Sequence, residues 1–250
     1  MNGQMTMFDF LKQDFSVSNK IRLIELFAGY GSQAMALRNI GADFETYRVV
    51  EFDKYAIASY NAIHGTNFPT MDVCDVTADD LGIVDRDKYT YLLTYSFPCT
   101  DISIAGRMAG MSEDSETRSS LLWQVRRILL ECKDNLPQIL VMENVPAIHN
   151  GQNMPDFRKW LDFLNELGYS SYMQDLNAWD FDLAQNRERT FVVSLLGEYN
   201  YKFPETISDL DFCMDDYFED LTEEQALQLV VKSEKALDLL VKLDEKGQLE

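Results

Sequence analysis

Apolar, β-branched segments alternate with amphipathic segments along most of the chain. The segments with strand character are 21–29, 44–53, 89–97 and 137–145, a short one at 70–76, and two closing ones at 170–181 and 188–197. Helical spacing of apolar residues marks 32–41, 54–65, 118–133 and 154–168. Regular alternation of strand and helix predicts an α/β fold, with a mostly parallel sheet and helices on both faces. In such sheets ligands bind beyond the carboxyl ends of the strands, so the residues that follow each strand are the candidates for chemistry.

The end of the chain has a different pattern, and it predicts a separate acidic helix. Thr222 precedes Gln225 by three residues, which is the spacing of a capping box. Ala226, Val230, Leu237 and Val241 would then share one helical stripe, packed either on the chain's own domain or on a partner. We therefore expect three parts: an N-terminal extension over 1–20, a main domain over 21–200 and an acidic helical tail over 201–250.

Composition adds that this is a globular chain, with 46% hydrophobic and 12% aromatic residues among 250. No apolar run approaches the roughly 18–20 residues that span a bilayer, and the first twenty residues lack the pattern of a secretory signal. The four cysteines are widely spaced and form no CxxC pair. This spacing argues against a zinc site and a disulfide framework, and it fits a reducing cytoplasm.

The net charge of −20 is unfavourable for a protein that binds nucleic acid, because phosphates are usually bound by basic surfaces. The charge is unevenly distributed, since residues 203–250 hold 14 acidic and 4 basic side chains and so carry half of it. An acidic tail can coexist with a basic groove elsewhere. The alternative, a protein with no polyanionic partner, stays open on charge alone.

Polar residues at three successive segment ends suit an adenosine-containing cofactor. Gly29 and Gly31 form a tight turn before a helix N-terminus, although the full G-x-G-x-x-G fingerprint is missing. Glu51, about twenty positions after these glycines, is placed to accept hydrogen bonds from ribose hydroxyls. Asp75 ends the short segment that we expect to be the next strand. A plain strand-to-helix turn would show the same glycines.

The stretch "SFPC" places a cysteine where a strand must end. Pro98 has no N–H and stops the ladder, so Cys99 emerges at the carboxyl edge of the sheet. A cysteine there can act as a nucleophile if a nearby positive charge favours the thiolate, and an inert core cysteine is the alternative. Glu143 ends the next strand, where a half-buried carboxyl group can donate a proton. Arg187 and Arg189 alternate at the start of the last strand and can hold a carbonyl oxygen or a phosphate.

Six motifs in order resemble the DNA (cytosine-5) methyltransferase family: "ELFAGYGS", "EFDKYA", "DVT", "SFPC", "ENV" and "QNRER". The resemblance covers residues 21 to about 197. It implies a Rossmann-like S-adenosylmethionine-dependent methyltransferase fold, and a main domain that transfers a methyl group to carbon 5 of cytosine in DNA. Double-stranded DNA would be the substrate, with the target cytosine flipped out of the stack, because a stacked base cannot reach such a pocket.

The resemblance also assigns roles to residues. Cys99 would be the nucleophile, Glu143 would bind ring N3, and Arg187 and Arg189 would steady the flipped base. S-adenosyl-L-methionine would be the cofactor, and no metal is implied. Its binding residues would be Phe27, Gly29, Gly31, Glu51, Phe52, Asp75, Val76, Pro98 and Leu121.

The sequence departs from the family most at its end. Family members continue into a target-recognition region and return a late segment to the catalytic domain, whereas only about 50 residues follow the last matched strand here. The chain is therefore expected to be a truncated form, one subunit of a split enzyme that needs a second polypeptide, or a non-catalytic relative with an acidic interaction surface. A fourth hypothesis is an RNA cytosine methyltransferase. The setting would be the cytoplasm of a bacterium or of a phage-infected host, in restriction-modification or phage protection.

Overall fold

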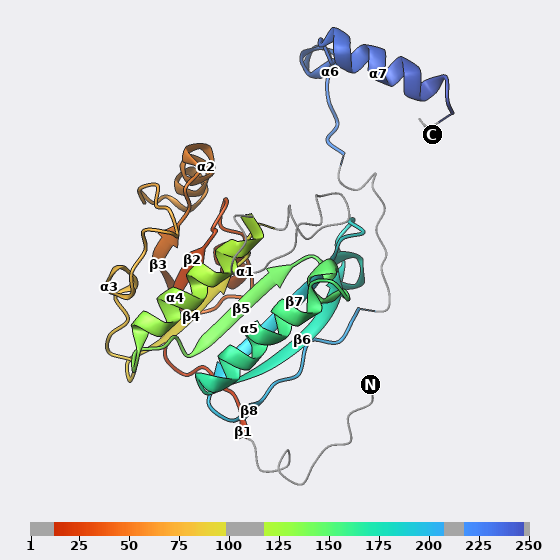
Figure 1. The fold of residues 1–250 in the computed structure, drawn as a ribbon. Coiled ribbons are helices and arrows are strands. Elements are labelled where there is room, and N and C mark those ends of the chain that lie inside the picture. Colours follow the sequence, from red (N-terminus) through yellow and green to blue (C-terminus); the bar gives the residue numbers. More distant parts are fainter. Residues whose placement is uncertain (1–12, 99–117, 208–217, 248–250) are drawn as a thin grey trace. The chain divides into compact units, whose positions relative to one another are not determined.

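The computed structural model describes residues 13–98, 118–207 and 218–247. Its centre is a six-stranded sheet in the order β3-β2-β4-β5-β7-β6 (Figure 1). The strands are β2 (Lys20–Leu26), β3 (Phe44–Val50), β4 (Tyr89–Tyr95), β5 (Ile139–Asn144), β6 (Tyr169–Asn177) and β7 (Glu188–Leu196). Strands β3, β2, β4 and β5 pair in parallel, and β7 pairs antiparallel with both β5 and β6. The predicted α/β fold with a mostly parallel sheet is confirmed.

Two long helices cover one face of this sheet (Figure 1). In α4 (Leu122–Cys132), buried residues recur at helical spacing, at Leu122, Val125, Leu129 and Cys132. The buried residues of α5 (Met154–Glu166) include Trp160. All of these belong to the larger hydrophobic core, together with strand residues that face the same side, including Leu93, Tyr95, Met142 and Val192.

The opposite face has a smaller core under α1 (Ser32–Asn39). Ala34 of this helix is buried and packs with Leu23, Leu92 and Ile139 of the strands. Near it, α2 (Lys54–His64) begins at Asp53, whose side chain accepts hydrogen bonds from the N–H groups of Tyr55 and Ala56. It ends at a left-handed glycine, as the sequence predicts. The remaining elements of this unit are short: β1 (Gln13–Asp14), β8 (Tyr199–Asn200), α3 (Ala78–Leu81), η2 (Arg118–Leu121), η3 (Pro146–His149) and η4 (Ala178–Phe181).

The short strand expected at 70–76 is wrong, because this segment forms a turn. Asp72 explains the difference: its side chain accepts a hydrogen bond from the N–H of Cys74, and its carbonyl accepts one from the N–H of Asp75. An aspartate that bonds the backbone two residues on favours a turn over a strand ladder. Asp75 therefore lies in a turn beside the sheet and not at the end of a strand.

The described residues 218–247 belong to a second compact unit. The capping box at Thr222 and Gln225 is present and begins α6 (Glu223–Leu229). The single stripe predicted through Ala226, Val230, Leu237 and Val241 is wrong, since the helix stops at Val230 and α7 (Glu234–Asp244) starts anew at Ser233. Ser233 caps α7 through the N–H of Ala236 and so competes with a continuous helix. In the part of the chain that the structure describes, no helix is long and apolar enough to cross a membrane.

Candidate active site

The turn after β2 holds three residues with positive φ: Phe27 (58°), Gly29 (56°) and Gly31 (85°). The two glycines serve different purposes. A Cβ on Gly31 would lie 2.5 Å from Cε2 of Tyr60 and would also collide with His64, so Gly31 allows α2 to pack against the turn. A Cβ on Gly29 would meet no atom within 4 Å, so the space beside Gly29 is open. A ligand can therefore approach the backbone closely at Gly29.

Glu51 follows β3 and fixes the glycine turn. Its side chain is only 9% exposed, and its carboxylate accepts hydrogen bonds from the N–H of Gly29 (2.9 Å) and the N–H of Asp53 (2.8 Å). A carboxylate has about four acceptor positions, so two of them can still accept ribose hydroxyls. Phe52, the next residue, is 70% exposed and offers a free ring face to a base.

The remaining residues predicted to bind the cofactor are Asp75, Val76, Pro98 and Leu121. Met71 donates its backbone N–H to the carbonyl of Glu51 (2.9 Å), which fixes the turn containing Asp75 next to the end of β3. Asp75 is exposed, whereas Val76 is buried in the larger core. Pro98 and Leu121 are half-buried, and Leu121 packs on the same core.

Glu143, Arg187 and Arg189 come together where β5 ends and β7 begins. Oε1 of Glu143 lies 3.1 Å from Nε of Arg189 and 3.9 Å from Nη2 of Arg187. The antiparallel pairing of Glu143 with Phe191 brings the start of β7 beside the end of β5, and this explains the contact. Glu143 is half-buried as expected, but it is ion-paired and not isolated in an apolar environment. Cys99 lies outside the described residues, so its role stays a prediction.

Asn144 connects the two strand ends that the sequence marks for chemistry. It is 3% exposed, donates its side-chain amide to the carbonyl of Phe97 (3.0 Å), and accepts the N–H of Val145 (2.9 Å). Phe97 precedes Cys99 by two residues, so this bond connects the cysteine-bearing segment to the strand that carries Glu143. Sequence reasoning did not single out Asn144, although an amide directly after an apolar strand is a signal of this kind.

Sequence reasoning also missed a buried carboxyl group beneath the glycine turn. Glu25 is fully buried in β2, where it accepts hydrogen bonds from the hydroxyl of Tyr60 and from the N–H of Ala34 (3.3 Å). Burial raises the pKa of Glu25 to about 7, against the lowering effect of these two bonds. The signal was available, because an acidic residue inside the apolar run "IRLIELF" must be paired or protonated.

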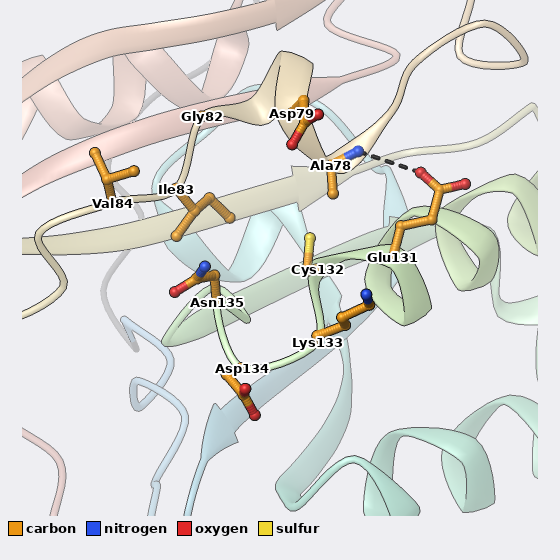
Figure 2. A pocket seen from close by; sticks show the side chains of 10 residues that line it. All are labelled: Ala78, Asp79, Gly82, Ile83, Val84, Glu131, Cys132, Lys133, Asp134 and Asn135. Carbon is orange, nitrogen blue, oxygen red and sulfur yellow. Dashed lines mark hydrogen bonds between the residues drawn. The ribbon is translucent and has the colours of Figure 1, made fainter.

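A pocket of ≈ 470 Å³ lies elsewhere, between α3 and the C-terminal end of α4 (Figure 2). Its lining includes Ala78, Ile83, Glu131 and Cys132, and none of the residues predicted for chemistry. Burial raises the pKa of the Cys132 thiol to about 11, so this cysteine is a weak nucleophile at neutral pH. The pocket is distinct from the strand-end site.

Comparisons with known proteins show the family. The family model described as C-5 cytosine-specific DNA methylase matches residues 21–246. The chain is similar to the type II methyltransferase M2.ScrFI of Lactococcus lactis subsp. cremoris, with 33% identity over 82% of this chain and 69% of the relative. It is also similar to the orphan methyltransferase M.SssI of Spiroplasma monobiae, with 32% identity over 73% of this chain and 61% of the relative.

Solved structures share the fold. The Entamoeba histolytica methyltransferase EhMeth superposes with a TM-score of 0.67 at 16% identity, over 83% of this chain and 62% of its own. The Dnmt2 methyltransferase of S. pombe gives a TM-score of 0.57 at 22% identity, over 83% of this chain and 57% of its own. This chain therefore spans about three-fifths to two-thirds of the length of these proteins.

Proposed function

Because the chain belongs to the C-5 cytosine-specific DNA methylase family, we propose that it carries the methyl-transfer half of a DNA (cytosine-5) methyltransferase. The single observation that carries the proposal is the pairing of Glu143 with Arg189 at the sheet edge where the "SFPC" strand ends. That edge also holds the glycine turn and Glu51, so a base and a methyl donor can approach each other there.

The chemistry starts from the fact that carbon 5 of cytosine is a poor nucleophile. In our proposal the Cys99 thiolate adds to carbon 6, which leaves electron density on carbon 5 and the N3 side of the ring. Glu143 donates a proton or a hydrogen bond to N3, where negative charge develops, and Arg189 fixes the direction of the carboxyl group. Carbon 5 then attacks the methyl group as the sulfonium–methyl bond breaks, which releases S-adenosylhomocysteine. A base such as water takes the carbon-5 proton, and elimination of the Cys99 thiolate restores the aromatic ring.

S-adenosylmethionine is the methyl donor of this family, and the residues present fit it. The open space at Gly29 can admit the methionine part of the donor, and the free acceptor positions of Glu51 suit the donor's ribose hydroxyls. The exposed ring of Phe52 is placed to flank the adenine, with Asp75 and Val76 at the adenine edge. When bound, the donor supplies an electrophilic methyl group, and the protein's part is to orient it and exclude water.

Target recognition requires a surface that binds DNA phosphates and reads base edges. The relatives above are longer than the matched region, and the described tail helices are acidic and unlike a phosphate-binding surface. We propose that double-stranded DNA binds with its target cytosine flipped, and that further polypeptide, in the same chain or a second one, supplies the recognition region. Similarity to bacterial and phage methyltransferases supports our proposal that the reaction takes place in the cytoplasm of a bacterium or an infected host.

The proposal is tested by methyl transfer from tritiated S-adenosylmethionine to double-stranded DNA, with RNA of the same sequence as a parallel substrate. Any adjacent reading frame that encodes a recognition region is co-expressed. We expect label in DNA cytosine with the wild type and none with Cys99→Ser. Calorimetry should show cofactor binding that weakens on Glu51→Ala. Label in RNA alone would favour an RNA methyltransferase, and no cofactor binding would favour a non-catalytic relative.

A further inference from the structure

One side chain of α4 holds the turn that contains Asp75. Nη2 of Arg127 contacts three carbonyl oxygens of this turn, those of Val76 (2.8 Å), Val73 (3.2 Å) and Cys74 (3.3 Å). These residues lie more than fifty positions before Arg127 in the chain. The turn forms no strand, so this guanidinium supplies the cross-links that a sheet ladder would otherwise give.

The guanidinium is itself fixed in place. Its Nε donates to the side-chain oxygen of Gln124 (2.9 Å), and its Nη1 pairs with Oε1 of Glu131 (2.8 Å). The other oxygen of Glu131 accepts the N–H of Ala78 (3.2 Å), which Figure 2 shows as a dashed line. Arg127 thus uses all three of its nitrogens, and its partner carboxylate also reaches the residue that follows the turn by two positions.

The backbone geometry of the turn follows from these contacts. A peptide unit is planar, so the carbonyls of Cys74 and Val76 that Arg127 contacts fix the two peptide units on either side of the Asp75–Val76 unit, and this restricts the Val76 N–H between them. The N–H of Val76 makes only a long contact of 3.4 Å to the carbonyl of Val73, so it keeps most of its capacity as a donor. The side chain of Asp75, between the held residues, is exposed, and a carboxylate can accept hydrogen bonds from a ligand.

We infer that Arg127 is a positioning residue for the cofactor, setting the Val73–Val76 turn so that Asp75 and the N–H of Val76 meet the adenine edge together. This inference rests on the proposed function, because it takes the adenine to lie beside this turn. An acceptor side chain next to a backbone donor matches the amino group and the adjacent ring nitrogen of adenine. Arginine is required because a lysine ammonium lacks the planar fork that reaches carbonyls, an amide and a carboxylate at once.

The test is calorimetric titration with S-adenosylhomocysteine and with S-inosylhomocysteine, in which an oxo group replaces the adenine amino group. The variants are Arg127→Met, Arg127→Lys and Arg126→Met. Arg126 is the matched control, because it neighbours Arg127 on the same helix but its guanidinium lies 5.2 Å from the ring of Phe163. Hydrogen exchange of the Asp75 and Val76 amides is measured in parallel.

In Arg127→Met we expect affinity for S-adenosylhomocysteine to fall about tenfold, because several hydrogen bonds to the turn are lost. The preference for the adenine over the inosine compound should fall by a similar factor, and the two amides should exchange faster. Arg126→Met should keep both the affinity and the preference of the wild type. Catalytic turnover should stay near that of the wild type in the control variant Arg126→Met.

The outcomes distinguish failure of the Arg127 role from failure of the proposed cofactor site. Wild-type preference retained in Arg127→Met overturns the inference and leaves the proposed function intact. If Arg127→Met fails to fold, Arg127→Lys decides, because it keeps the charge and should still lose the adenine preference. A wild type that binds neither compound overturns the proposed cofactor site itself.

Discussion

Oε1 of Glu143 lies 3.1 Å from Nε of Arg189, and the two residues reach this contact from antiparallel strands that are 46 positions apart in the chain. The contact is half-buried, with side-chain exposures of 24% and 22%. Because Arg189 restricts where the Glu143 carboxylate can point, the arginine and the acid form one unit at the strand ends. Arg187, at 3.9 Å and 48% exposed, is a looser second cation.

Replacement of Arg189 by methionine should slow methyl transfer by about 10²–10³-fold, the usual effect of removing one group that stabilises developing charge. Binding of S-adenosylhomocysteine should be unchanged, because the contact lies on the side of the site where we propose that the base binds. Single-turnover kinetics measure the first quantity and calorimetry the second. Arg158→Met on the exposed side of α5 is the control, and equal loss of rate in both variants would contradict the assignment.

The two glycines of the first turn should respond differently to alanine. Gly31→Ala must displace Tyr60 or His64, and it should cost about 2–4 kcal/mol of unfolding free energy. Gly29→Ala meets no neighbour and should cost about 1–2 kcal/mol, the strain of a left-handed residue, yet weaken cofactor binding strongly. Gly41→Ala is the control, since Gly41 also has positive φ and open space but lies outside the site. Urea unfolding measures the unfolding free energy, and calorimetry measures the cofactor affinity. Equal cofactor affinity in Gly29→Ala and Gly41→Ala would contradict a role of Gly29 in binding the cofactor.

Burial of Glu25 should make the unfolding free energy depend on pH. Its pKa is raised by burial from 4.5 to about 7, so between these values the folded protein binds a proton that the unfolded chain has released. Stability from this group is fully present below pH 4.5 and is lost as the pH rises to 7, by about 3 kcal/mol in total. Urea unfolding of the wild type and Glu25→Gln at pH 5, 6, 7 and 8 should show the wild type losing stability relative to the variant. A difference that is independent of pH would show that Glu25 does not titrate in this range.

The sequence was sufficient for the elements whose patterns are local. The strand at 89–97 and the helix at 154–168 are close to β4 and α5, because a continuous apolar run and a helical stripe each define one structure. The order of the six motifs was sufficient to predict the family. The sequence assigned Glu143 and Arg189 to the same site but did not predict their contact. The antiparallel register that joins them is a long-range property, which local patterns do not reveal.

The errors arose where a side chain outside the segment, or a cap within it, decides the structure. Residues 70–76 have enough valine for a strand, but Asp72 and the distant Arg127 hold a turn instead. The tail pattern fits one helix, but the Ser233 cap divides it into two. Pairing of Glu25 with Tyr60 could not be read locally either, because it joins β2 to α2 across 35 residues.

The central claim is that Cys99 attacks carbon 6 of a cytosine that Glu143 holds. The most direct measurement is covalent trapping on double-stranded DNA with 5-fluorocytosine at the target position, in the presence of S-adenosylmethionine and any recognition polypeptide. Fluorine cannot leave as a cation, so the protein should stay attached to the DNA and migrate as a complex that resists denaturation. We expect this adduct with the wild type, a much slower adduct with Glu143→Gln, and none with Cys99→Ser. An adduct of undiminished yield in Cys99→Ser would contradict the account.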